Sequence, residues 1–170
     1  MERSDIPGFS DKNQMYRFLR NRATSVMSSE NDWLANLSNA SALVFLFLKD
    51  INWSGFYIRK GNELILGPFQ GKPACTRIPL GKGVCGTAAA EKRAIVVPDV
   101  HGFPGHIACD TASRSEIVVP VMQGSDVAAV LDIDSPVPER FDGEDETGLQ
   151  KFVDTISRFI NWEEIRKAFE

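Results

Sequence analysis

The sequence predicts an α+β fold, in which a central antiparallel sheet of about six strands carries helices from both chain termini on one face and loops on the other. Three observations predict it. Apolar residues recur at helical spacing near both ends, the period changes to two in between, and turn signals separate the short strands. The 170 residues suffice for one good core but not for two, so we expect residues 1–170 to form one domain, with residues 1–10 flexible.

Two helices are expected at the start of the chain and one at its end. The first spans residues 11–27, and the second begins after a cap at Asn31 or Asp32. The last begins at about Gly143, behind the cap Asp142, and acidic residues occupy its positive end. Its buried stripe is expected to consist of Leu149, Phe152, Val153, Ile156, Phe159 and Ile160.

The middle of the chain is expected to supply the sheet. A short helix, Val84 to Lys92, interrupts the strands, and a loop from Pro98 to Arg114 follows the fourth strand. This loop of about 17 residues exceeds the usual length of a connection without secondary structure, which favours a functional role. The expected strands are residues 52–59, 63–69, 74–80, 94–97, 115–122 and 127–134.

Composition excludes several classes of partner. The net charge is −4, and the 19 Lys and Arg residues are spread along the chain, so no nucleic-acid footprint is present. The N-terminus is polar, and the longest apolar run, Ala42 to Leu48, covers seven residues where a membrane span needs about 20. We therefore expect a soluble, cytoplasmic protein without a nucleic-acid or membrane partner. The sequence leaves the oligomeric state open, a homodimer included.

The three cysteines of the chain, Cys75, Cys85 and Cys109, lie within one window of 35 residues. An odd number of cysteines without a secretion signal argues against a permanent disulfide framework. Clustered thiols in a cytosolic protein indicate a transient disulfide, either catalytic or redox-sensing. The function is therefore expected in this window.

Two other patterns in this window have simpler interpretations. Residues 81–86 match the dinucleotide motif G-x-G-x-x-G, but the strand before them alternates and no repeated βαβ unit follows. We interpret these glycines as a tight turn that brings Cys85 close to another backbone. A zinc site is disfavoured because no C-x₂₋₄-C pair occurs. The ligands available to it are Cys75, Cys85, Cys109, His101 and His106, and both histidines are expected to make local hydrogen bonds.

Acidic residues on two expected strands form a candidate site. Asp132 and Asp134 are two apart, so both side chains leave the same face, and Glu116 begins the neighbouring strand. A solvent-facing row explains the pair equally well. If the three carboxyl groups converge in a cleft, at least one pKa is raised and supplies a proton donor near neutral pH.

Aromatic residues on the first expected strand form a second candidate. Trp53 and Tyr57 share a face with Gly55 between them, which fits the apolar wall of a small pocket. Packing in the core is the more common role of aromatic residues on a strand.

Taken together, these residues identify a protein family more specifically than any one of them does alone. The runs INWSGFY (51–57), LGPFQGKPACTRIPLGKGVCGTA (66–88), DVHGFPGHIACDTASRSEIVVPV (99–121) and VLDIDSP (130–136) resemble the free methionine-(R)-sulfoxide reductases, which are stand-alone GAF-domain enzymes. The resemblance covers most of residues 51–136 in order and implies a GAF-like fold. Pro73, Gly102 and Pro104 depart from the family pattern without touching an expected catalytic group.

The resemblance also implies roles for individual residues. Cys109 corresponds to the attacking cysteine, and Cys75 and Cys85 correspond to resolving cysteines. Attack on the sulfoxide would leave a sulfenic acid, and condensation with a second thiol would give a disulfide, which an external dithiol such as thioredoxin reduces. No bound cofactor is implied. The remaining matches are Glu116, Asp132 and Asp134 for the amino group and the sulfoxide oxygen, Trp53 and Tyr57 for the methyl group, and backbone amides from Ile107 and Ala108 to Cys109 for the carboxylate.

Two rival functions remain. A GAF sensory module would bind a small ligand, or sense redox state, through the same cysteines, but such modules are normally fused to an effector domain. A structural interaction domain leaves the clustered thiols and acids unexplained. No cation certain to lower the pKa of Cys109 is evident, and His106 and Arg114 are the candidates.

Overall fold

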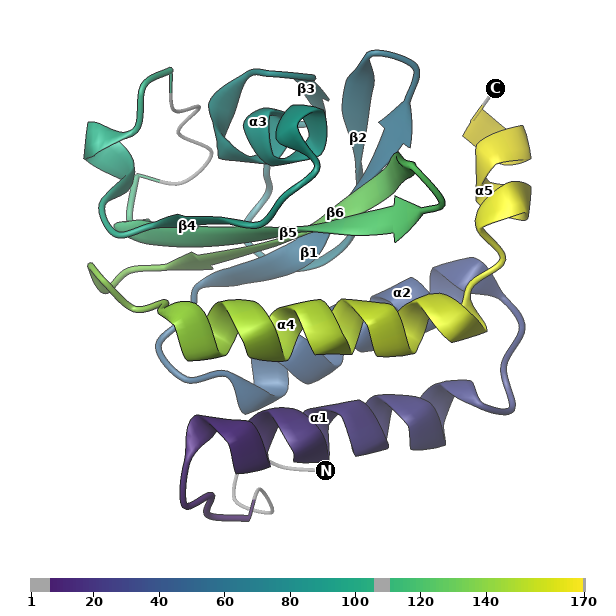
Figure 1. Cartoon of the computed structure of the whole chain (residues 1–170), viewed down its shortest axis with the longest axis horizontal. Coiled ribbons are helices and arrows are strands. Elements are labelled where there is room, and N and C mark those ends of the chain that lie inside the picture. Colours follow the sequence, from purple (N-terminus) through teal and green to yellow (C-terminus); the bar gives the residue numbers. More distant parts are fainter. Residues whose placement is uncertain (1–6, 106–110, 170) are drawn as a thin grey trace.

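The computed structural model describes residues 7–105 and 111–169. Its centre is a six-stranded, fully antiparallel sheet with the order β3-β2-β1-β6-β5-β4 (Figure 1). The strands are β1 (Trp53–Lys60), β2 (Glu63–Gly71), β3 (Arg77–Pro79), β4 (Ile95–Val97), β5 (Ser115–Gln123) and β6 (Asp126–Ser135). The helices are α1 (Lys12–Met27), α2 (Trp33–Phe47), α3 (Gly83–Glu91), α4 (Gly143–Ile156) and α5 (Trp162–Phe169), with short 3₁₀ turns η2 (Val100–Gly102) and η3 (Ser157–Phe159). The predicted α+β class is confirmed.

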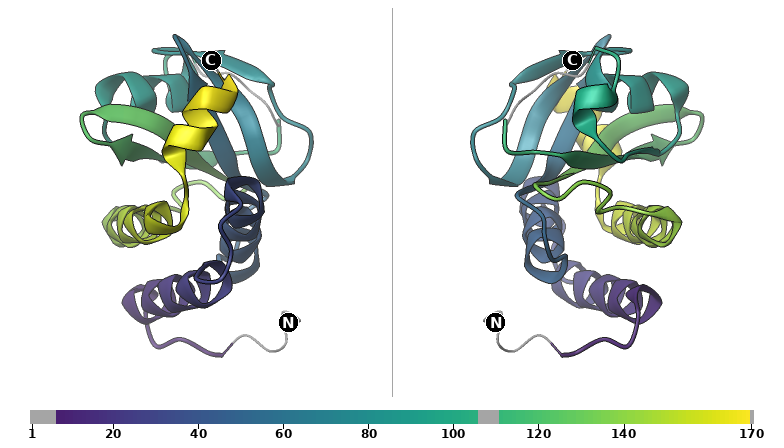
Figure 2. Two further views of the ribbon diagram at one scale, coloured as in Figure 1. Left: turned by 90° about the vertical axis from the view of Figure 1, so that its right-hand side faces the viewer. Right: turned by 90° about the vertical axis from the view of Figure 1, so that its left-hand side faces the viewer.

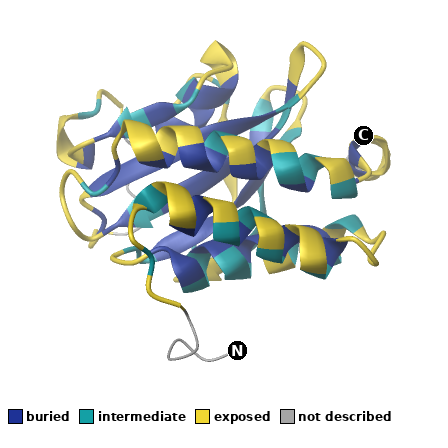
Figure 3. Cartoon of the chain, turned by 60° about the horizontal axis from the view of Figure 1, so that its bottom comes forward, coloured by how far each residue is buried: buried dark blue, intermediate teal, exposed yellow. Residues whose placement is uncertain are grey.

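Helices from both ends of the chain cover one face of the sheet, as predicted. In Figure 1 and the side views of Figure 2, α2 and α4 lie against the strands and α1 lies farther out, packed on both. Their apolar stripes face the sheet and each other, and their polar faces are exposed (Figure 3). The close approach of α1 and α4 depends on Gly148, because a Cβ there would lie 2.2 Å from the Tyr16 ring. The large core of the molecule is on this side.

The opposite face carries α3 in addition to loops, which the sequence pattern had not assigned to it. This helix packs on β5 and β6 above a second, smaller hydrophobic cluster (Figure 1). Gly86 permits a close approach of α3 to the end of β3, because a Cβ there would lie 2.3 Å from the Pro79 carbonyl oxygen. Since β3 pairs antiparallel with β2 at the sheet edge, residues 81–86 do not belong to a βαβ nucleotide-binding unit, as the sequence indicated.

Two predicted boundaries were wrong by more than two residues. The strand expected at residues 74–80 pairs with β2 only at Arg77–Pro79, and the Cys75 carbonyl accepts from the Tyr57 hydroxyl instead of from a ladder on β2. The last helix ends at Ile156 rather than Ile160, and the chain turns through η3 and an extended Ile160 into α5. Among the described residues, no helix is long and apolar enough to cross a membrane.

Candidate active site

The register of the three central strands brings the predicted site residues into one row. Trp53 on β1 lies opposite Asp134 on β6, and Asp134 lies opposite Glu116 on β5. Residues that face each other across antiparallel strands project from the same side of the sheet. Segments far apart in the sequence therefore place an aromatic ring and two carboxyl groups side by side beneath α3.

The next row places Asp132 beside a gap left by glycine. Asp132 on β6 lies opposite Gly55 on β1, which in turn faces Phe69 on β2. A Cβ on Gly55 would lie 2.5 Å from the Trp53 ring and 2.4 Å from the Phe69 Cβ. Glycine is required here because the Trp53 ring folds down over this position. The ring stacks on Phe69 with a centroid distance of 5.4 Å.

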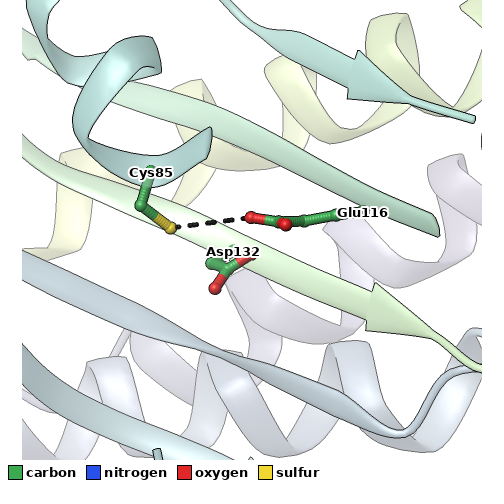
Figure 4. Close-up of side chains that lie close together, drawn as sticks. All are labelled: Cys85, Glu116 and Asp132. Carbon is green, nitrogen blue, oxygen red and sulfur yellow. Dashed lines mark hydrogen bonds between the residues drawn. The ribbon is translucent and has the colours of Figure 1, made fainter. Parts of the chain in front are cut away.

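Helix α3 brings a thiol to these acids. The Sγ of Cys85 lies 3.9 Å from Glu116 Oε1 and close to Asp132 (Figure 4). The three side chains offer donor atoms within 4.8 Å of one another, and all three are buried. They are therefore the described residues placed to hold a metal ion, and only Cys85 among them belongs to the Cys and His ligands considered from the sequence. Such an ion would have to displace protons that burial favours.

Burial and mutual repulsion favour the neutral forms of these groups. The pKa of Glu116 is raised well above its ordinary value by burial and by the Asp134 charge. Burial and the Glu116 charge likewise raise the pKa of Asp132 well above the usual range of aspartate. Burial, followed by the nearby Asp132 and Glu116, raises the pKa of the Cys85 thiol. At least one raised carboxyl pKa was expected if the acids converge, and burial raises the pKa of both Glu116 and Asp132.

The acids do not form a solvent-facing row. Glu116 and Asp132 are only 5% and 6% exposed, whereas Asp134 is partly exposed. The Oδ1 atom of Asp132 is buried and has no hydrogen-bond partner among the residues that the structure describes. A buried carboxyl oxygen without a partner is costly unless a ligand satisfies it. This oxygen suits a donor such as an ammonium group.

The two aromatic residues combine packing with contacts to a neighbouring segment. Trp53 and Tyr57 are buried and stack with centroids 5.9 Å apart. Their polar atoms donate to backbone carbonyls, Trp53 Nε1 to Lys72 at 3.1 Å and Tyr57 OH to Cys75 at 3.0 Å. A cavity of about 10 Å³, enough for about one water molecule, separates this wall from the acids. Its lining consists of Trp53, Tyr57, Lys72, Pro73, Ala74, Asp132 and Asp134.

The structure places the remaining predicted residues unequally. Cys75 is a half-buried free thiol packed at the edge of the cluster beneath α3. Cys109, Ile107, Ala108 and His106 lie outside the described residues, so their predicted roles stay predictions. His101 bonds locally to Asp99, with 2.8 Å between its Nδ1 and Oδ1, as expected.

Two features of the site were missed from the sequence. Lys72 and Phe69 join the pocket region, although neither stands out in the strand pattern. The end of the long loop is tied to the start of β1 through a 3.2 Å hydrogen bond from Asn52 Nδ2 to Ser113 Oγ. The glycines at 67 and 71 near the end of β2 were the available signal for a close approach there, since a Cβ on Gly71 would lie 2.7 Å from the Trp53 ring.

Comparison with known proteins agrees with this geometry. The GAF domain family matches residues 32–160. The free methionine-R-sulfoxide reductase of Escherichia coli is 47% identical over 159 residues, which cover 94% of this chain and 96% of that protein.

Two solved structures are similar over nearly the whole fold. The free methionine-R-sulfoxide reductase of Neisseria meningitidis in complex with its substrate has a TM-score of 0.87 and 42% identity, covering 96% of this chain and 97% of that one. The fRMsr of Staphylococcus aureus in complex with substrate has a TM-score of 0.81 and 52% identity, covering 85% and 94%. With its six-stranded sheet and buried acids, the chain therefore belongs to the free methionine-R-sulfoxide reductases, a family of GAF-domain oxidoreductases.

Proposed function

We propose that this protein reduces free L-methionine-(R)-sulfoxide to L-methionine by thiol chemistry. The observation that carries the proposal is the pair of buried carboxyl groups, Glu116 and Asp132, whose pKa values burial raises, beside an aromatic wall. A sulfoxide becomes a good electrophile only when its oxygen is protonated or strongly hydrogen-bonded. A neutral carboxylic acid supplies that proton.

The proposed substrate orientation follows from the chemistry of each wall. Asp132 and Asp134 receive the ammonium group, and Glu116 faces the sulfoxide oxygen. The stacked rings of Trp53 and Tyr57 receive the methyl group. Because the cavity holds about one water molecule, the segment that contains Lys72 and Ala74 has to shift when the substrate enters. Backbone amides of residues 107–109 are assigned to the carboxylate by family resemblance alone.

In the proposed first step, the Cys109 thiolate attacks the substrate sulfur. Glu116 protonates the sulfoxide oxygen, which gives an adduct with an S–S bond between Cys109 and the substrate and a hydroxyl group on the substrate sulfur. The hydroxyl group then transfers from the substrate sulfur to the Cys109 sulfur as the substrate S–O and S–S bonds break, so methionine leaves and Cys109 becomes a sulfenic acid. Two electrons pass from the cysteine to the substrate.

The second step regenerates the enzyme without a bound cofactor. A second thiol attacks the sulfenic acid, releases water and leaves a disulfide, which a dithiol such as thioredoxin reduces. We assign the first attack to Cys75, because burial disfavours the reactive thiolate of Cys85. A cytoplasmic location agrees with this dependence on a dithiol.

Single-turnover chemistry of cysteine variants tests the proposal. Reduced Cys109→Ser should release no methionine from free methionine-(R)-sulfoxide. Cys75→Ser and Cys85→Ser, the matched controls, should each still release about one equivalent per chain, because the attacking thiol remains. A normal burst from Cys109→Ser would overturn the assignment of the attacking cysteine. No turnover by reduced wild type would favour the sensory-module alternative.

A further inference from the structure

The segment between β2 and β3, residues 72–76, has no regular structure although it forms one wall of the pocket. Its position depends on contacts from other elements. The Leu66 N–H donates to the Thr76 carbonyl at one end, and Trp53 Nε1 donates to the Lys72 carbonyl at the other. Between them, the Tyr57 hydroxyl donates to the carbonyl of Cys75 at 3.0 Å. A side chain of the proposed substrate pocket thus holds the backbone of Cys75, one of the two proposed resolving cysteines.

Tyr57 is a rigid donor for this bond. It lies on β1, which pairs with β2 on one side and β6 on the other, and it is 1% exposed. Its ring stacks on Trp53 at an angle of 25°. Cys75, in contrast, lies in an irregular segment and is half-buried. Strand β1 therefore holds the Tyr57 hydroxyl in place, and the hydrogen bond from this hydroxyl holds the backbone of Cys75.

The hydroxyl is not needed to receive a methyl group. A phenylalanine ring offers the same apolar face as tyrosine, and a buried hydroxyl costs free energy unless it is hydrogen-bonded. The hydrogen bond to the Cys75 carbonyl gives the hydroxyl a role separate from that of the ring. Cys85, held on a regular helix, needs no such anchor.

We infer that the Tyr57 hydroxyl is a positioning group for Cys75, which keeps this thiol at the pocket wall, ready to react with the oxidised attacking cysteine. The inference rests on the proposed function. Tyr57 then has two roles. Its ring contacts the substrate, and its hydroxyl positions Cys75 for the reaction that forms the disulfide. Loss of the hydroxyl loosens residues 72–76 without removing the ring.

Thiol labelling of Tyr57→Phe tests the positioning directly. In the reduced, folded protein, Cys75 should react with iodoacetamide about two- to tenfold faster than in wild type, because a typical hydrogen bond has been lost from its segment. Cys85, read in the same sample by peptide mass spectrometry, should react at the wild-type rate. Tyr16→Phe is the matched control, because it removes the hydroxyl of the other tyrosine, which donates to Asp145 far from the site. It should leave Cys75 labelling unchanged.

A second readout follows the regeneration step. After one equivalent of substrate, the interval between methionine release and the loss of two thiols should lengthen in Tyr57→Phe and stay the same in Tyr16→Phe. Cys75 labelling within twofold of wild type, or a parallel increase at Cys85, would overturn the inference. So would an unchanged interval. Failure of the proposed function is distinguishable, because wild type itself would then release no methionine.

Discussion

Glu116 and Asp132 are carboxyl groups buried on a sheet face that otherwise packs with apolar residues. Their neutral forms reduce the cost of burial, because a charged carboxylate would lose far more hydration than a protonated one. The same state suits proton donation. At the scale of single residues, burial therefore has two linked effects. It favours the protonated carboxyl groups, which cost less to bury, and these protonated groups are the form that can donate a proton.

Glu116→Gln should lower the single-turnover rate of methionine release about 10²- to 10⁴-fold, the usual contribution of general acid catalysis. Glutamine keeps the shape and cannot transfer the proton. The wild-type rate should fall as the pH rises through the raised pKa of Glu116, since only the protonated form donates. Rapid-quench measurement across a pH series checks both effects. Asp126→Asn, which alters a 74% exposed side chain, should stay within about twofold of wild type.

The free energy of unfolding should also depend on pH through the titration of Asp132. Its pKa is raised in the folded protein, so its contribution is fully present below the ordinary carboxyl pKa of about 4 and is lost as the pH rises through the raised value. Asp132→Asn removes this titration, so the free energy of unfolding of the variant should gain on wild type as the pH increases. Urea unfolding at a series of pH values measures the difference. A constant difference between the two proteins would contradict the raised pKa.

Prediction from sequence succeeded best where the alternation along a strand determines the face of the sheet from which a side chain projects. The spacing of Asp132 and Asp134 predicted a common face, but it did not predict that Asp132 is buried while Asp134 is partly exposed. Cys85 on α3, whose place over the sheet was not predicted either, lies close to Asp132 (Figure 4). The stacking of Trp53 on Tyr57 agrees with their shared strand face. Their bonds to Lys72 and Cys75 could not be predicted, because those carbonyls belong to a segment without periodicity.

At the scale of elements, the close packing of α1 against α4 depends on one glycine, Gly148. Gly148→Ala should lower the free energy of unfolding by about 1–3 kcal/mol, because the new methyl group overlaps the buried Tyr16 ring. Gly143→Ala is the matched control in the same helix, since nothing lies within 4 Å of its Cβ position, and it should change stability by less than about 0.5 kcal/mol. Chemical denaturation compares the two. Equal effects would show that the contact is not tight.

Element boundaries were predicted where a local cap marks them and missed where tertiary contacts set them. Asp142 caps α4 through the N–H groups of Glu144 and Asp145, as its position indicated. Helix α5 was not predicted, although Asn161 accepts from the Glu164 N–H at its start. A helix of eight residues is marginal alone and is held here because Ile165 is buried in the main core.

The two faces of the sheet divide the work of the whole molecule. Helices α1, α2 and α4, with Trp162 and Ile165 of α5, bury the larger core on one face, while α3 and the connecting segments build the candidate site on the other (Figures 1 and 2). The antiparallel sheet and its helix-covered face followed from the change of period along the chain. The assignment of α3 to the second face did not, because periodicity reports which side of a helix is apolar and not where the helix lies.

The redox cycle makes a prediction for the complete chain. Reduced protein should titrate three thiols under denaturing conditions, since it has three cysteines. After one equivalent of substrate it should titrate one, because the proposed disulfide joins Cys109 to Cys75 or Cys85. Titration with a chromogenic disulfide measures the number. Three free thiols after methionine release would exclude the disulfide step.

The central claim is specificity for free methionine-(R)-sulfoxide, and the reaction of reduced wild type with one equivalent of substrate tests it most directly. The buried acids suit a free ammonium, and an acylated nitrogen would leave Asp132 unpaired, which typically reduces reaction by orders of magnitude. The free R epimer should yield about one equivalent of methionine. The S epimer, N-acetylmethionine sulfoxide and a sulfoxide-containing peptide should yield almost none. Comparable yields from free and N-blocked substrates, or from both epimers, would contradict the account.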